Sequence, residues 1–215
     1  MNLRLAWFDL RYGLPTAVRV LVSELGLFRA LRVGLAVGWR GLTRDPFRPL
    51  RGGAPPSPGE AFTRRQLEPV LLLEGVLRER HGLDPARTRE VLGRVVAETG
   101  ARFVQFNVDH PTRAHWRGLD EAGRRALANG MLQQFGNAEA ELVDVSAEGL
   151  GFDVSLCHFV ELTRRLERPE LASLFCAADS VAYGDPKLPV ALERDQTLAG
   201  GDSCCAFRFR FRDPA

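Results

Sequence analysis

The chain has 215 residues, 45% of them apolar, and its 29 basic and 27 acidic residues give a net charge of +2. This length allows one domain with a buried core, or a domain with a helical extension. The nearly balanced charge argues against a nucleic-acid-binding protein. Lys187 is the one lysine and isoleucine is absent, a bias typical of a GC-rich bacterial genome.

Residues 1–45 are predicted to form a helical extension. The apolar segment 15–40 indicates one or two helices, with Gly26 and Gly34 as candidate breaks. Its charged residues leave no uncharged run of the ~20 residues that a membrane span needs; they are Arg19, Glu24, Arg29 and Arg32. Its cationic, Leu/Val-rich character permits contact with a membrane surface. Packing on the domain or on a second subunit is favoured over that contact, and the oligomeric state stays open.

Residues 46–60 are rich in proline and glycine, which predicts a linker before a main domain at 61–215. Helical patterns follow, and their ranges are 60–82, 84–108 and 119–136. Pro69 is expected to kink the first of them and Gly82 to end it. Asp84 is the expected N-cap of the second.

The pattern changes after residue 138. Two short alternating runs flank Ala-Glu-Gly and predict a hairpin, two helical stretches follow, and two more strands close the chain. These segments cover 140–146, 149–156, 157–167, 168–179, 189–198 and 205–211. The order β-β-α-α-β-β predicts an antiparallel sheet with helices on one face, so the fold class is α+β.

The closing strand alternates phenylalanine and arginine. Side chains of a strand point to opposite faces in turn, so Phe207, Phe209 and Phe211 share one face with Cys205, while Cys204 lies on the arginine face. We therefore expect Cys205 to point inward and Cys204 to have no role in a site.

All four cysteines lie in the last third of the chain, and no signal-peptide pattern precedes them, so we expect a cytoplasmic protein with reduced thiols. Cys157 is placed at a helix N-terminus, which lowers a thiol pKa. Cys176 is placed at a helix end with Asp179 one turn on, and Cys205 at the start of the last strand. The three thiols are expected to meet at one sheet edge, either as a site or as buried apolar groups.

These residue types allow two chemistries. A thiolate attacks an electrophilic carbon directly, with Asp179 as the base. Alternatively, thiolates and a carboxylate bind zinc and activate water. The spacings match no zinc signature, so the cofactor is left unknown, with zinc as the option.

Residues 152–211 also carry an ordered set of motifs: Cys157, then Cys176 with Asp179, then Arg194 with Thr197, then the Gly-Gly-Asp-Ser-Cys-Cys-Ala-Phe ending. In this order they resemble the L-2-amino-thiazoline-4-carboxylic acid hydrolase family. A similar Gly…Cys-x-Phe ending occurs in 4-vinyl reductase-like domains, which supplies the alternative of a small-molecule or metal-binding module without turnover. This chain has Ala206 where the hydrolase family often has an acidic residue.

The resemblance implies a hydrolase that acts on a small molecule and opens a cyclic amidine of the thiazoline type, at C–N and C–S bonds. The residues it implies as catalytic are Cys157, Cys176, Asp179 and Cys205. Arg194 and Thr197 are the implied substrate-binding residues, with Arg194 as the clamp for a substrate carboxylate. The alternative for Arg194 is a solvated strand position.

Overall fold

The helical part of the chain comes first. The computed structural model describes residues 3–108 and 110–213. Its helices before the sheet are α1 (Leu3–Phe8), α2 (Leu14–Leu25), α3 (Leu27–Thr43), α4 (Pro58–Glu79), α5 (Pro85–Asn107), α6 (Arg113–Gly118) and α7 (Glu121–Leu132). A π-helical turn, Asp9–Gly13, joins α1 to α2, and a 3-10 turn, Arg48–Leu50, lies between α3 and α4.

Side-chain caps explain where several of these helices begin. Asp84 accepts a hydrogen bond from the N–H of Arg87, which confirms the expected N-cap of α5. Ser57, Thr112 and Asp120 cap α4, α6 and α7 in the same way. Gly26, with a φ of 79°, ends α2, because this left-handed backbone costs glycine little.

The predicted break at Gly34 is absent, because Gly34 lies inside α3. Helix α4 continues through Pro69 to Glu79, and the kink expected at Pro69 remains a prediction. The ring of Pro69 removes one N–H donor, yet buried side chains on both sides of it hold the helix against the core.

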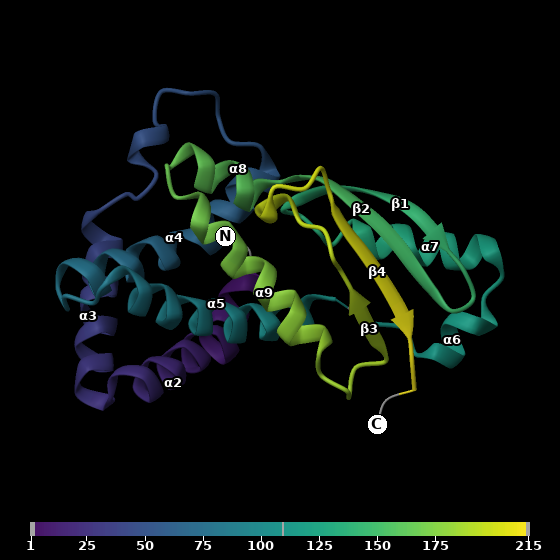
Figure 1. Cartoon of the computed structure of the whole chain (residues 1–215), viewed down its shortest axis with the longest axis horizontal. Helices are drawn as coiled ribbons and strands as arrows, with labels where there is room; N and C mark the ends of the chain where they lie inside the picture. The colour runs from purple at the N-terminus through teal and green to yellow at the C-terminus, as the bar shows by residue number, and fades with distance from the viewer. Residues whose placement is uncertain (1–2, 109, 214–215) are drawn as a thin grey trace.

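The C-terminal third has the predicted order. Its elements are β1 (Ala138–Val145), β2 (Gly149–Cys157), α8 (His158–Arg165), α9 (Ala172–Tyr183), β3 (Val190–Glu193) and β4 (Cys205–Phe211), with 3-10 turns at Pro169–Leu171 and Leu198–Gly200. All pairings are antiparallel, in the order β1-β2-β4-β3. The fold is therefore α+β, with a helical first half and a four-stranded antiparallel sheet (Figure 1).

One face of the sheet is the main core. Phe207, Phe209 and Phe211 are buried on it, and Phe207 stacks on Phe152 of β2 with ring centroids 4.9 Å apart. Side chains of α5, α6, α7 and α9 complete this cluster, so these helices cover the same face. Each buried phenylalanine contributes about 1.5–3 kcal/mol. On the opposite face, Arg208 pairs with Asp153 at 2.7 Å.

A second core joins the first helices to the rest. Buried side chains of α2 and α3, such as Val20 and Val33, meet Val76 of α4 and Val91 of α5. The inner faces of α2 and α3 therefore pack on the chain itself, as favoured above. No helix in the described ranges is long and apolar enough to cross a bilayer. The division at residues 45 and 60 remains a prediction.

Two predicted boundaries are wrong, and both matter for the site. Cys176 lies in the middle of α9, because the helix continues to Tyr183, whose ring is buried against the sheet. The predicted strand 189–198 ends at Glu193, because only Val190–Glu193 pair with β4. Arg194 therefore stands outside the strand.

Candidate active site

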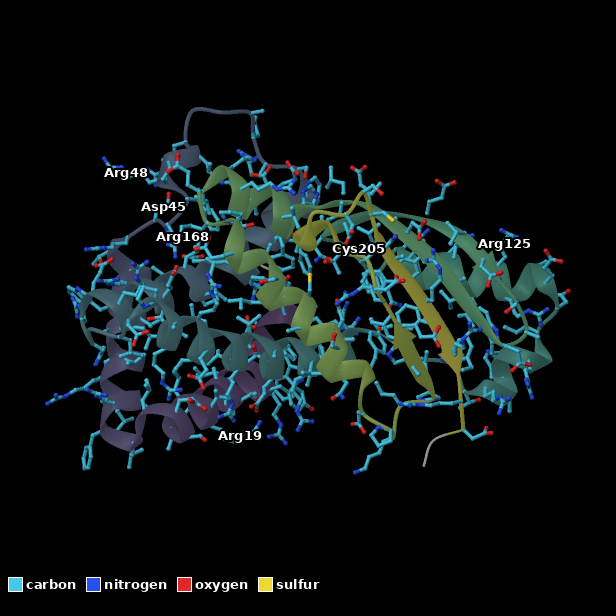
Figure 2. The ribbon with its side chains drawn as sticks, in the orientation of Figure 1. Arg19, Asp45, Arg48, Arg125, Arg168 and Cys205 are labelled. Carbon is cyan, nitrogen blue, oxygen red and sulfur yellow. The ribbon has the colours of Figure 1, made fainter. Side chains whose placement is uncertain are left out.

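The site lies where β2 runs into α8 and where β4 begins. Val154 of β2 is paired with Cys205, and Cys157 is the last residue of the same strand. Figure 2 labels Cys205 at this end of the sheet. Cys176 interacts electrostatically with Asp179, Cys157 and Cys205, so the structure brings the three predicted thiols and the carboxylate together. All four cysteines are free thiols.

Arg194 connects this cluster to α9. Its Nη1 donates to Oδ2 of Asp179 at 2.7 Å, and its Nη2 donates to the carbonyl oxygen of Cys176 at 2.7 Å. Its guanidinium carbon lies 4.8 Å from the ring centroid of Phe207. Only 6% of its side chain is exposed, so Arg194 is a buried part of the cluster and not a solvated strand residue.

One nitrogen of Arg194 remains available. Among the described residues, its buried Nε has no hydrogen-bond partner. Arg194 also lines a cavity of about 160 Å³ with Ser180, Tyr183 and Leu192. A buried donor without a partner is costly, so this nitrogen is an unusual feature of the cluster.

Asp179 is a largely buried carboxylate beside this arginine, with 20% of its side chain exposed. Burial raises its pKa above the ordinary value, while the charge and hydrogen bond of Arg194 act in the opposite direction. A carboxyl group with a raised pKa exchanges protons more readily near neutral pH than an exposed aspartate does. The position therefore suits a general acid or base.

Burial raises the pKa of two of the thiols, which favours their protonated form. It raises the pKa of Cys176 to about 12, although the positive charge of Arg194 lowers it. Burial also raises the pKa of Cys157, against the N–H groups of Phe159 and Val160 at the start of α8. The expected lowering by the helix N-terminus is therefore wrong in sign for Cys157, because desolvation outweighs it.

Cys205, like Cys157, receives a backbone N–H at its sulfur, and the charge of Arg194 acts on it as well. The backbone N–H of Leu198 donates to its sulfur at 3.2 Å, and this bond and Arg194 both favour the thiolate, although burial still raises the pKa of Cys205. A donor aimed at the sulfur stabilises negative charge there. Cys205 is therefore the best-placed thiolate of the three.

Thr197 shapes the turn that supplies this donor. Its hydroxyl accepts from the N–H of Gly200 at 3.1 Å, and its own N–H donates to Oδ2 of Asp202 at 2.7 Å. These bonds fix the 3-10 turn that holds Leu198 above Cys205. The structure thus places Thr197 beside the site, with its hydroxyl already engaged in the turn.

The remaining polar residues lie outside the cluster. Cys204 is half-buried, with its sulfur 3.9 Å from Oε1 of Gln196, while Cys205 is buried with the phenylalanines. The predicted strand parity is confirmed for Cys205 and the phenylalanines, while Cys204 lies one residue before β4. His158 packs against Gly59 at the start of α4.

Sequence reasoning missed Tyr183. Its ring is buried, 4.8 Å from that of Phe209, and it lines the cavity at Arg194. Burial and the charge of Asp179 both raise its pKa, which keeps its hydroxyl protonated as a donor. The available signal was its spacing: Asp179 and Tyr183 are four residues apart on one helix, so they share a face.

The donor set does not fit a metal ion. Within residues 3–108 and 110–213, no three His, Cys, Asp or Glu side chains are arranged to hold one. Asp179 is instead engaged by Arg194.

Fold and site together define an α+β protein with a buried cluster of thiols, one carboxylate and one arginine. A family model described as L-2-amino-thiazoline-4-carboxylic acid hydrolase matches residues 77–209, from the end of α4 into β4. The match spans more than half of the chain, so the protein belongs to this family. No curated protein and no solved structure gives a significant match.

Proposed function

We propose that the protein hydrolyses a small cyclic amidine of the thiazoline type that carries a carboxylate. The observation that carries this proposal is the buried Asp179–Arg194 pair beside three thiols, with a cavity at the arginine. A volume of about 160 Å³ suits a single small ring better than a drug-sized ligand. Membership of the family supports the same class of substrate.

The substrate carboxylate binds on the cavity side of Arg194. Two nitrogens of the guanidinium are already held by Asp179 and Cys176, so its orientation is fixed before the substrate enters. Arg194 and Tyr183 both line the cavity, so the guanidinium charge and the phenol hydroxyl are the groups that receive the carboxylate in this proposal. The amidine carbon then faces the thiols, which lie beside Arg194 but are not among the residues that line the cavity.

Ring opening begins with transfer of the Cys205 proton to Asp179. The sulfur of Cys205 adds to C2 of the ring, and the N–H of Leu198 stabilises the sulfur before attack. The tetrahedral species then breaks its bond from C2 to the ring sulfur, and the departing thiolate takes the proton from Asp179. An amidine carbon now remains bonded to Cys205.

Water completes the reaction. Asp179 accepts a proton from water as the oxygen adds to the same carbon, and the bond to the Cys205 sulfur breaks. The carbon leaves as a urea, the N-carbamoyl group, and the proton returns to Cys205. No oxidant, reductant or further reactant is needed, and one water is consumed for each thiol released.

A turnover assay with 2-amino-thiazoline-4-carboxylate tests this function. We expect release of one free thiol per substrate consumed, detected with a chromogenic thiol reagent, together with N-carbamoyl-cysteine in the product. Ligand binding without thiol release would overturn the proposal and favour the binding module of the 4-vinyl reductase-like type.

A further inference from the structure

Exposed apolar side chains gather at one end of the protein. Of the 13 large hydrophobic residues that are exposed in the described ranges, 11 fall between Trp7 and Leu42. The other two are Val143 and Val181. Figure 1 places α3 and part of α2 at the end of the molecule away from the sheet.

Helix α3 is apolar on two faces. Its inner face carries Ala30, Val33 and Ala36, which are buried in the core shared with α4 and α5. Its outer face carries an apolar stripe of Phe28, Leu31, Leu35, Trp39 and Leu42, of which Phe28 and Leu42 are each 83% exposed. The spacings of three and four residues keep this stripe on one side of the helix. An ordinary surface helix has polar residues there.

A second stripe precedes it. Trp7, Leu10, Leu14 and Val18 follow one another at spacings of three and four along α1, the π-helical turn and α2, and each is more than 40% exposed. We call these residues, with the outer stripe of α3, the apolar end. Exposed apolar surface of this extent marks a site of interaction with a partner or a membrane.

The apolar end lies on a strongly cationic segment. Residues 3–44 contain seven arginines and only two acidic residues, a formal charge of +5, against +2 for the whole chain. Both acids are already paired: Asp9 with Arg65 of α4 at 3.0 Å, and Glu24 with Arg87 of α5 at 2.7 Å. Three of the arginines are paired as well: Arg19 with Glu98 of α5, and Arg40 and Arg44 with Glu79 of α4. The positive charge offered to a partner therefore comes mainly from the arginines on the outer side of α3.

Arginines border the outer stripe of α3. Arg29 and Arg32 are exposed on that helix, and α3 contains no acidic residue. Their long apolar stems lie along apolar surface while the guanidinium groups reach a polar layer. Trp7, Tyr12 and Trp39 are exposed in the same segment, and such side chains are favoured at the boundary between hydrocarbon and water.

We propose that the apolar end of α1–α3 binds the surface of an anionic lipid bilayer, with its apolar side chains in the interface and its arginines at the headgroups. The combination of a cationic segment with an exposed apolar face is that of an interfacial helix, which lies on a membrane without spanning it. A second copy of this chain is a poorer occupant, because two faces of the same positive charge would be brought together.

Vesicle co-sedimentation tests the proposal. We expect the protein to bind vesicles that contain phosphatidylserine and not vesicles of phosphatidylcholine alone, with binding that weakens as salt rises. The double variant Phe28→Glu/Leu35→Glu should lose at least tenfold in affinity, because both side chains are highly exposed and their change adds negative charge. Val143→Glu, at an exposed apolar position on β1, is the matched control and should bind like the wild type.

Tryptophan fluorescence gives a readout that needs no variant. Trp7 and Trp39 are exposed, whereas Trp116 is fully buried and donates to the carbonyl of Ser146 at 2.8 Å. Anionic vesicles should therefore shift the emission to the blue. Failure to bind such vesicles, or a stable dimer that the double variant converts to monomer without vesicle binding, would overturn the proposal. Neither result bears on thiol release, so the two proposals fail separately.

Discussion

Two buried arginines, Arg194 and Arg40, show what separates a candidate site from a structural ion pair. Each has a side chain only 6% exposed, each has an Nε without a partner among the described residues, and each pairs with one carboxylate. The difference lies in the partners. Glu79, bound by Arg40 at 2.6 Å, is 55% exposed, whereas Asp179 is 20% exposed.

The surroundings differ as well. Arg194 and Asp179 stand among three thiols and the ring of Phe207, while Glu79 also receives Arg44 at 3.5 Å. Water can hydrate the Arg40 pair on its carboxylate side. A buried arginine is therefore no mark of a site by itself; the mark is a buried partner with titratable neighbours.

The largest effect is expected from Asp179→Asn. The amide oxygen still accepts from Arg194, so the fold is kept, but the base is lost and the rate should fall by about 10²–10⁴-fold. Glu79→Gln is the matched change at the other arginine and should leave the rate unchanged. Thiol release by protein shown to be folded by circular dichroism measures both. Wild-type activity of Asp179→Asn would contradict the role of Asp179 as the general base.

Replacing each arginine in turn should lower the free energy of unfolding by different amounts. Arg194→Met leaves Asp179 buried without its cation, which should lower the free energy of unfolding by about 3–5 kcal/mol. Arg40→Met leaves a carboxylate that water can reach, and the loss should be about 1 kcal/mol or less. Urea denaturation at neutral pH compares them. Equal losses of unfolding free energy would mean that the burial of the paired carboxylate does not affect the stability of the fold.

Alkaline pH should lower the free energy of unfolding by a smaller amount, through the single thiol of Cys176. The pKa of Cys176 is raised from 9.0 in the unfolded chain to about 12 in the folded one. A raised pKa gives stability that is complete below pH 9 and is lost as the pH rises toward 12. Between pH 8 and pH 10 this thiol alone should cost the fold about 1.4 kcal/mol. Urea denaturation of the wild type and of Cys176→Ala at both pH values isolates this loss; an identical pH dependence would contradict the burial of the thiol.

Local periodicity accounts for what the sequence could predict. The inward position of Cys205 follows from the two-residue repeat of β4, which its own residues determine. The cap at Asp84 is equally local. The order of strands and helices in the last third follows from such signals added along the chain.

What the sequence could not predict depends on distant contacts. The burial of Arg194 requires Asp179 of α9, fifteen residues away, to face it across the site. The pKa of Cys157 is set by how much protein surrounds the thiol, which outweighs the local effect of the helix N-terminus. The donor to Cys205 is a backbone N–H of Leu198, which has no side-chain signature.

The comparison of Cys205→Ser with Cys204→Ser tests the central claim most directly. The two cysteines are adjacent, but one lies in the site and the other lies beside Gln196, just before the strand begins. Specific activity is measured as thiol release per folded protein. The account predicts that Cys205→Ser loses activity by at least about a thousandfold, as expected for removal of a nucleophile, while Cys204→Ser keeps the wild-type rate. Equal activity of the two variants would contradict the assignment of Cys205 and the mechanism built on it.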